Sequence, residues 1–425
     1  MNQGGIVDIT EYVKNKALEA REGARAMAVA ETKRKNNVLV KMADSLRAEK
    51  QYLISENEKD VAAAKEKGLS EALIDRLTLN EKRIAEMSDG LIEVSQMADP
   101  VGEISNMRKR PNEMLVGKMR VPIGVVSIIY ESRPNVTADA AGLCLKAGNA
   151  VILRGGSEAI NSNKAIVSIL RKAIYAADLP EGAVTFIDNT QREVVMEMLK
   201  LEGLIDLVIP RGGEGLIRTV TENSRIPVLK HYKGVCHVFV DRDCNQGMAM
   251  EICFNSKVQR PGTCNAMETL LVDAVIAKEF LPPMIRRFSE AGVSILGCPL
   301  TMEICSEQAA PVKEEDYYVE YLSLKLNVRV VIGMDEAIAH IAKYGSSHTE
   351  AIVTNNHQRA MRFLREVDSS AVLINASTRL NDGGQFGLGA EIGISTDKIH
   401  ARGPMGLQEL TTEKFIVFGN GQLRM

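Results

Sequence analysis

Segment 255–266 holds the residues most capable of chemistry. It reads Asn-Ser-Lys-Val-Gln-Arg-Pro-Gly-Thr-Cys-Asn-Ala, so Cys264 falls on a short connection between a helical pattern that ends at Pro261 and a following β-type run. A thiol in such a place can be exposed and act as a nucleophile, with Lys257 and Arg260 favouring the thiolate. The alternative is a cysteine that only packs, because free Cys is among the most buried residue types.

Composition and charge narrow the functional classes. The 425 residues suffice for two or three compact units, and the 45% hydrophobic and 25% charged fractions are those of an ordinary globular protein. A formal net charge of -3 gives no general attraction to nucleic acid or anionic membrane. The sequence has no run long enough for a membrane span and no secretion signal, which predicts a cytoplasmic protein.

The numbers and spacing of the cysteines and histidines indicate whether the thiols are reduced and whether the chain binds a metal. Seven Cys is an odd number without paired metal-binding spacing, so we expect reduced thiols. The six His residues are scattered along the chain, and we therefore predict no metal site.

The first half of the chain predicts a helical region followed by a parallel sheet. Apolar or small residues recur at helical spacing from Val13 onward, and residues 10–98 are interpreted as several helices. Short apolar runs then alternate with helical patterns, which is typical of a parallel sheet covered on both faces. The expected strands are 124–130, 150–153, 184–187 and 204–209.

Two glycine-rich turns follow strands of this predicted sheet. They consist of Arg154, Gly155, Gly156 and Ser157, and of Arg211, Gly212 and Gly213. Such turns let backbone N–H groups face a phosphate while an arginine supplies positive charge, so the pair predicts a dinucleotide site. Glycine is also used where the backbone only needs a positive φ, and neither turn has the G-x-G-x-x-G spacing.

A second α/β unit is expected after residue 240. It contains mixed helices and strands up to residue 374, then a glycine-dense loop at 382–393. Segments 114–120 and 410–418 are predicted to be strands of an arm that contacts another copy, although a plain surface hairpin fits them equally well.

Four motifs give the chain a resemblance to the aldehyde dehydrogenase superfamily along nearly its whole length. They are Tyr-Glu-Ser-Arg-Pro-Asn at 130–135, Lys-Ala-Gly-Asn-Ala-Val at 146–151, the segment 260–268, and Tyr-Gly-Ser-Ser-His-Thr-Glu at 344–350. The last motif is similar to that of the branch that reduces an acyl phosphate.

The resemblance implies an α/β fold with three parts. These are a Rossmann-type parallel-sheet dinucleotide-binding domain at 1–108 and 124–240, an α/β catalytic domain at 241–404, and a small β oligomerisation arm at 109–123 and 405–425. It also implies at least a homodimer.

The same resemblance implies roles for individual residues. Cys264 matches the family nucleophile, and Asn135 matches the amide that stabilises the oxyanion. Without the family match, Asn135 is more simply a turn residue after Pro134.

The implied cofactor is NADP(H). Arg154 stands where the family binds the adenosine ribose, and Ser157 replaces the Glu of NAD-preferring relatives, which would repel a 2′-phosphate. The turn 211–213 matches the pyrophosphate contact. Glu320 matches the Glu that holds the nicotinamide ribose, with an exposed carboxylate at a strand edge as the alternative.

One departure from the family suggests the reaction. Hydrolytic members carry a general-base Glu where this chain has Lys-His-Tyr-Lys-Gly at 230–234, so water near a thioester is not activated. The resemblance therefore implies reduction of L-glutamyl 5-phosphate by NADPH to L-glutamate 5-semialdehyde through a Cys264 thioester, with release of phosphate, as a step of proline biosynthesis. Arg133 and Glu268 are the candidates for binding the amino-acid head group, with a salt bridge or surface charge as the alternative.

Two other functions remain open at this stage. One is a dehydrogenase of the same fold that transfers the acyl group to coenzyme A, and the other is a non-catalytic scaffold in which Cys264 only packs. Direct transfer of the acyl phosphate from a glutamate 5-kinase is a further possibility that the sequence leaves undecided.

Overall fold

The computed structural model describes residues 8–424, apart from the side chain of residue 72, and its contacts divide the chain into two units. The first unit comprises Met1–Lys230, Gly387–Gly393 and Met405–Met425, and the second comprises His231–Phe386 and Ile394–Pro404. Parallel sheets with helices between their strands confirm the predicted α/β fold class.

The first unit begins with five helices, as the apolar spacing predicts. In α1, Val13, Ala17, Ala20, Ala24 and Met27 are all buried, and the Asp8 side chain caps the helix by accepting from the N–H of Thr10. None of the helices in residues 8–424 is long and apolar enough to cross a membrane. The five are α1 (Ile9–Met27), α2 (Thr32–Ala48), α3 (Lys50–Glu66), α4 (Glu71–Leu77) and α5 (Glu81–Gln96).

A four-stranded parallel sheet forms the centre of the first unit. Its strand order is β5-β4-β3-β6, and every residue of β3 is buried because the run Val-Val-Ser-Ile-Ile-Tyr is apolar on both faces. The carboxyl ends of β4, β3 and β6 are therefore neighbours. The elements are β3 (Val125–Tyr130), α6 (Asn135–Lys146), β4 (Ala150–Arg154), α7 (Ile160–Tyr175), β5 (Val184–Phe186), α8 (Arg192–Met198), β6 (Leu207–Arg211) and α9 (Glu214–Asn223).

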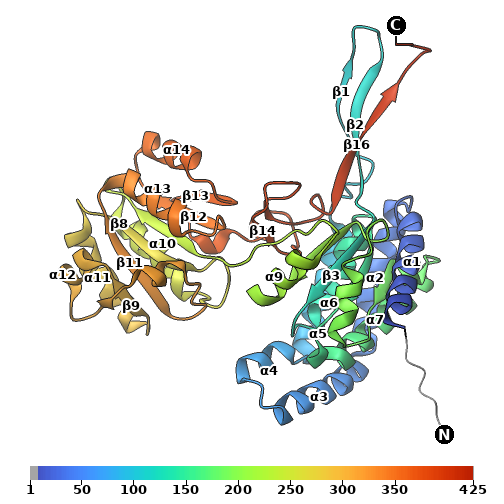
Figure 1. The fold of residues 1–425 in the computed structure, drawn as a ribbon, viewed down its shortest axis with the longest axis horizontal. Coiled ribbons are helices and arrows are strands. Elements are labelled where there is room, and N and C mark those ends of the chain that lie inside the picture. The colour runs from blue at the N-terminus through green and yellow to red at the C-terminus, as the bar shows by residue number, and fades with distance from the viewer. Residues whose placement is uncertain (1–7, 425) are drawn as a thin grey trace. The chain divides into compact units, whose positions relative to one another are not determined.

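The predicted arm is a three-stranded antiparallel sheet of β1 (Ile104–Lys109), β2 (Leu115–Pro122) and β16 (Thr411–Phe418). The last strand pairs with β2 along its whole length, from Thr411 opposite Pro122 to Phe418 opposite Leu115, and the strands lie side by side in Figure 1. The expected start of the arm at residue 109 is wrong, because β1 begins at Ile104 and already pairs with β2.

The second unit contains a seven-stranded parallel sheet with the order β10-β9-β11-β8-β7-β12-β13. The predicted boundary near residue 240 is too late, because β7 pairs with β8 and β12 of this sheet. The elements are β7 (Cys236–Val240), α10 (Gln246–Val258), β8 (Met267–Asp273), α11 (Ala277–Glu290), β9 (Ser294–Gly297), α12 (Pro299–Cys305), β10 (Ala310–Pro311), β11 (Lys325–Val331), α13 (Gly333–Tyr344), β12 (Thr349–Val353), α14 (His357–Glu366), β13 (Ala371–Ile374), and the short pair β14 (Ile394–Ser395) and β15 (Gly403–Pro404).

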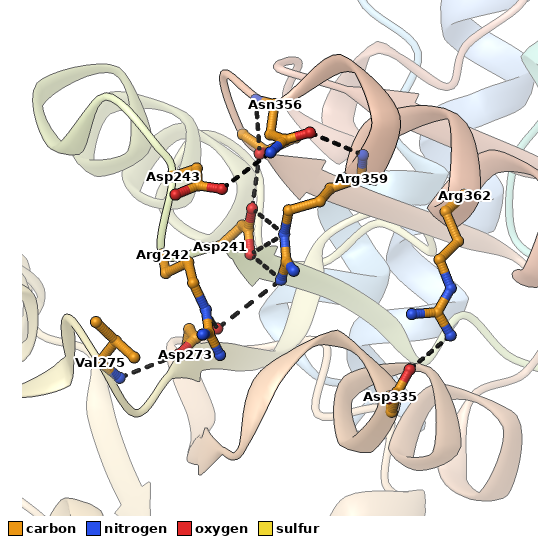
Figure 2. A network of polar contacts seen from close by, with 10 residues as sticks. Asp241, Arg242, Asp243, Asp273, Val275, Asp335, Asn356, Arg359 and Arg362 are labelled. Atoms are coloured by element: carbon orange, nitrogen blue, oxygen red, sulfur yellow. Dashed lines mark hydrogen bonds and ion pairs between the residues drawn. The ribbon is translucent and has the colours of Figure 1, made fainter.

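Ion pairs occupy the carboxyl edge of this second sheet (Figure 2). Asp241 follows β7 and Asp273 ends β8, and both side chains are fully buried. The Nε of Arg359 donates to both oxygens of Asp241 at 2.9 and 2.8 Å, and the Nε of Arg242 donates to Asp273 at 2.9 Å. The two buried aspartates are thus matched by two arginines, so this edge of the sheet is held together by its own side chains.

Candidate active site

Cys264 lies at the opposite, amino edge of the second sheet, in the loop between α10 and β8. The neighbouring strands β7 and β12 begin beside it, since the Cys236 thiol at the start of β7 donates to the Cys264 carbonyl oxygen at 3.2 Å. Cys264 is partly exposed, whereas Cys236 is buried. Residue 264 is therefore not sealed in the core, which suits a nucleophilic thiol.

Gly234 packs closely against the backbone of the loop that carries Cys264. A Cβ at Gly234 would lie only 1.7 Å from the Cys264 carbonyl oxygen, so this position requires a glycine. The Gly234 N–H donates to the Glu320 carboxylate at 2.9 Å, and the next N–H, of Val235, donates to Ser346 Oγ at 2.8 Å. Residues 234 and 235, just before β7, thus fix the position of the Cys264 backbone.

The imidazole rings of His231 and His348 lie near the Cys264 thiol. Ring nitrogens of His231 and His348 and the Cys264 sulfur all lie within 4.8 Å of one another, and the two rings meet edge to face with centroids 5.2 Å apart. Burial, together with a smaller effect of the His231 charge, lowers the pKa of His348 to about 3. His348 is therefore neutral at physiological pH.

The motif at 344–350 explains this packing. Its His348 contributes a ring to the cluster, its Ser346 accepts from Val235, and its Glu350 accepts from the N–H and the Nδ1–H of His237 at 2.8 and 2.9 Å. The motif therefore ties β12 to the start of β7, beside Cys264.

The Lys257 ammonium does not act on Cys264 as the sequence suggested. Its Nζ lies 2.6 Å from Glu268 Oε2, and both side chains are fully buried. Arg379 is a cation whose charge interacts with that of Cys264, and its guanidinium donates to Asn265 Oδ1 and, at 2.9 Å, to Gln259 Oε1. Burial lowers the pKa of Arg379, Arg260 lowers it further, and the charge on Cys264 raises it.

Glu268 has the surroundings of a structural ion pair. Burial raises its pKa to about 7, although Lys257 opposes that shift, and its Oε1 accepts from the Leu322 N–H at 3.3 Å. A fully buried carboxylate that already has these partners favours the salt-bridge alternative over contact with the substrate's ammonium group.

Glu268→Gln is therefore expected to lower the free energy of unfolding by about 3 kcal/mol, because it leaves the Lys257 charge buried without a counter-ion. Urea unfolding measures this effect. Lys257→Met combined with Glu268→Gln removes both charges and should recover most of the loss. A stable Glu268→Gln variant with a raised KM for the acyl substrate would instead favour the substrate-binding role.

In the first unit, Asn135 is the first residue of α6, directly beyond β3. Its amide nitrogen donates to Asp139 Oδ2 at 2.9 Å, one helical turn further along. Burial raises the pKa of Asp139 to about 6, against the lowering effects of Asn135 and Arg211. Asp139 thus orients the Asn135 amide, a contact that the sequence analysis missed although the i, i+4 spacing signals it.

The Arg154 turn lies at the carboxyl end of β4. The Arg154 guanidinium donates to the backbone oxygens of Gly155 at 3.0 Å and Thr190 at 3.1 Å. Ser157 begins the short helix that follows, and the neighbouring Glu158 accepts from the N–H and hydroxyl of Ser132 at 2.7 and 2.6 Å. The Glu158 carboxylate, which follows this turn, is thus directed toward the loop after β3.

The second glycine turn lies at the end of β6. The Gly213 N–H, at the start of α9, donates to Glu131 Oε2 at 2.9 Å, and a Cβ at Gly212 would lie 2.5 Å from the Glu131 carboxyl carbon. Arg211 packs against Gly393, whose φ of 148° and missing Cβ allow the guanidinium to approach. The Glu131 carboxylate thus occupies the position at the N-terminus of α9 where a helix commonly binds an anion such as phosphate.

The predicted residues accordingly fall into two groups. Asn135, the 154–157 turn and the 211–213 turn gather at the carboxyl edge of the first sheet, and the exposed Arg133 lies in the loop just before Asn135. Cys264, Glu268 and Glu320 belong to the second unit. His231 and His348 were not assigned roles from the sequence, and the 344–350 motif was the signal for one of them.

A parallel sheet with two glycine turns at one edge, together with a partly exposed thiol on a second α/β unit, defines a class of dehydrogenase. The chain belongs to the aldehyde dehydrogenase family, whose model matches residues 8–297. It also resembles an acetylating aldehyde dehydrogenase from Geobacillus thermoglucosidasius, with a TM-score of 0.71 at 17% identity over 99% of both chains, which shows the shared fold.

Within this family the chain is most informatively compared with the gamma-glutamyl phosphate reductases. It is 66% identical to the gamma-glutamyl phosphate reductase of Thermodesulfovibrio yellowstonii, over 98% of this chain and 100% of that relative. It is 58% identical to the one from Caldanaerobacter subterraneus, over 97% and 99%. The crystal structure of the Thermotoga maritima enzyme matches with a TM-score of 0.96 and 48% identity, over 97% of this chain and 100% of that one.

Proposed function

We propose that this oxidoreductase reduces L-glutamyl 5-phosphate to L-glutamate 5-semialdehyde with NADPH and releases phosphate, as a step of proline biosynthesis. The observation that carries the proposal is the surroundings of Cys264, together with the 66% identity to a gamma-glutamyl phosphate reductase. Cys264 is partly exposed, and three carboxylates of the second unit are engaged: Glu268 with Lys257, Glu350 with His237, and Glu320 with the Gly234 N–H. Activation of water at a Cys264 thioester is therefore disfavoured.

The proposed reaction begins with the Cys264 thiolate. Its sulfur forms a bond to the acyl carbon, the bond from that carbon to the phosphate oxygen breaks, and phosphate leaves with the electron pair. NADPH, when bound, supplies the hydride that reduces the resulting thioester carbonyl. The carbon–sulfur bond then breaks, which releases the aldehyde and restores the thiolate.

Stabilisation of the oxyanion is assigned to two donors. The Asn135 amide is oriented by Asp139 at 2.9 Å, and the Cys264 N–H belongs to a loop that Gly234 holds in place. Donors that are already fixed lose little freedom when negative charge develops on the substrate oxygen. Arg133 remains our candidate for the substrate's α-carboxylate, because its exposed guanidinium lies two residues before Asn135.

The residues of the first unit fit a nicotinamide dinucleotide. Arg154 and Ser157 would take the adenosine ribose and its 2′-phosphate, and the 211–213 turn the pyrophosphate, provided that Glu131 turns away from the Gly213 N–H. In the second unit, Glu320 would take the nicotinamide ribose. Preference for NADP(H) follows because no carboxylate occupies position 157, and Glu158 is engaged by Ser132.

Ser157→Glu is expected to raise the KM for NADPH at least about tenfold and to change that for NADH much less, because a carboxylate there repels the 2′-phosphate. Steady-state kinetics with both cofactors measures the difference. Ser168→Glu adds the same charge to an exposed position of α7 and serves as the control. Equal increases in both KM values would contradict this cofactor assignment.

The assay that tests the reaction generates the labile substrate in place. Glutamate 5-kinase, glutamate and ATP supply the acyl phosphate, and loss of NADPH absorbance reports its reduction. In the reverse direction, oxidation of the semialdehyde should require phosphate, and coenzyme A should not replace it. Turnover with coenzyme A but not phosphate would favour the acylating alternative.

We also propose that the enzyme is a cytoplasmic homo-oligomer joined through its β1-β2-β16 arm. Phe415, Val417 and Phe418 of β16 are exposed, and such apolar side chains on an outer strand favour contact with another copy. Association with a glutamate 5-kinase would shorten the exposure of the labile acyl phosphate to water.

A further inference from the structure

His231, Cys264 and His348 come from three distant parts of the sequence and meet at the amino edge of the second sheet. One atom of each, two ring nitrogens and a sulfur, lie within 4.8 Å of one another. A thiolate with two imidazoles is a ligand set that favours Zn²⁺ over Mg²⁺ or Ca²⁺, which prefer oxygen donors. The scattered positions of the histidines along the chain did not predict this cluster.

The His231 ring is anchored as a metal ligand would be. Its Nδ1 lies 2.7 Å from the Ile394 carbonyl oxygen, which can only accept, so Nδ1 carries the proton. In the neutral ring, Nε2 then bears the lone pair. Metal-binding histidines are commonly held by such a hydrogen bond from the other ring nitrogen to a backbone carbonyl.

The His348 ring is fully buried and leaves one nitrogen unsatisfied. Its Nδ1 lies 2.7 Å from Thr349 Oγ1, while its Nε2 has no hydrogen-bond partner within residues 8–424. The Thr349 hydroxyl is itself fixed, because the Asn381 amide donates to it at 2.7 Å. A buried nitrogen without a partner is unfavourable, and a metal bond would satisfy it.

We propose that His231, His348 and Cys264 bind one Zn²⁺ ion, with water as the fourth ligand. Zinc bonds of about 2.0–2.3 Å place tetrahedral ligands roughly 3.3–3.8 Å apart, so the side chains need to move by only about 1 Å. Binding forms a zinc–sulfur bond and releases the thiol proton to solvent, with no change of oxidation state.

Zinc bound in this way blocks the reductase. The sulfur that holds the metal is the one that must attack the acyl phosphate, so metal binding and thioester formation exclude each other. This inhibitory effect rests on the proposed function, whereas metal binding itself does not.

Calorimetric titration of the chelator-treated, full-length protein with Zn²⁺ tests the proposal. We expect one ion per chain, and at least about 100-fold weaker binding in Cys264→Ser and in His231→Gln, because loss of a direct ligand exceeds the roughly 10–100-fold effect of losing an outer partner. His348→Gln should act likewise. Since that ring is buried, His231→Gln at a partly exposed position gives the same test without disturbing the core. His357→Gln, at an exposed position on α14, is the control.

Two further measurements identify the ligands. Co²⁺ in place of Zn²⁺ should give a sulfur-to-metal charge-transfer band that Cys264→Ser abolishes, and Zn²⁺ should protect Cys264 from alkylation by iodoacetamide. Stoichiometric zinc binding that survives Cys264→Ser, or no binding by the unaltered protein, would overturn the proposal. Zinc binding without inhibition of turnover would leave the site in place but refute the role of Cys264 in the reaction.

Discussion

Replacing Cys264 by serine is expected to lower kcat by at least about 10⁴-fold, because removal of an enzyme's nucleophile eliminates nearly all of the chemical step. A hydroxyl at this position has a far higher pKa than a thiol, so it supplies almost no anion at neutral pH. The glycine turns lie in the other unit, and NADPH binding should therefore persist. The NADPH-consuming assay measures kcat, and NADPH fluorescence measures binding.

Cys244→Ser is the matched control for this variant. Cys244 is also partly exposed, but it follows β7 at the carboxyl edge of the sheet, where its N–H donates to the Asp241 carbonyl oxygen at 3.1 Å. That variant should keep both turnover and stability. If Cys264→Ser retained turnover while Cys244→Ser lost it, the thioester mechanism proposed for Cys264 would be untenable.

Gly234→Ala is expected to lower kcat/KM at least about 100-fold although residue 234 performs no chemistry. The new Cβ would lie 1.7 Å from the Cys264 carbonyl oxygen and 2.9 Å from its Cα, so the loop that holds the thiol must shift. A displacement of about 1 Å at the reacting group costs on the order of 10²-fold in rate. Overpacking should also reduce the free energy of unfolding by about 1–3 kcal/mol.

The control is Gly247→Ala in α10, where the nearest atom to the added Cβ is Asn245 Oδ1 at 3.4 Å, an ordinary contact. Thermal unfolding and the rate of Cys264 alkylation, measured on both variants, separate a displaced thiol from global unfolding. Unchanged alkylation and turnover in a folded Gly234→Ala protein would show that the Cys264 loop does not depend on this contact.

Local patterns were sufficient to predict the fold class. Alternating apolar runs and helical periods indicate strands and helices from neighbouring residues alone, and the short apolar run 125–130 is typical of a strand buried on both faces, which β3 is. The segment of β7 was assigned to the first domain, although it pairs with β8 and β12 of the second sheet, because strand partners are chosen by pairing across the sheet, which the strand's own sequence does not encode. For the same reason the arm was given too late a start.

From the sequence alone we could predict the candidate site residues: a cysteine on a short loop, two Arg-Gly-Gly turns after predicted strands, and the family motifs around them. The charge pairings became visible only in the folded chain. It paired Lys257 with Glu268, directed Glu131 to the Gly213 N–H, and brought His231 and His348 to Cys264. These contacts join residues that lie 11 to 117 positions apart in the chain, and such distances close only when the sheets form, because the strands fix the separation of the loops that they carry.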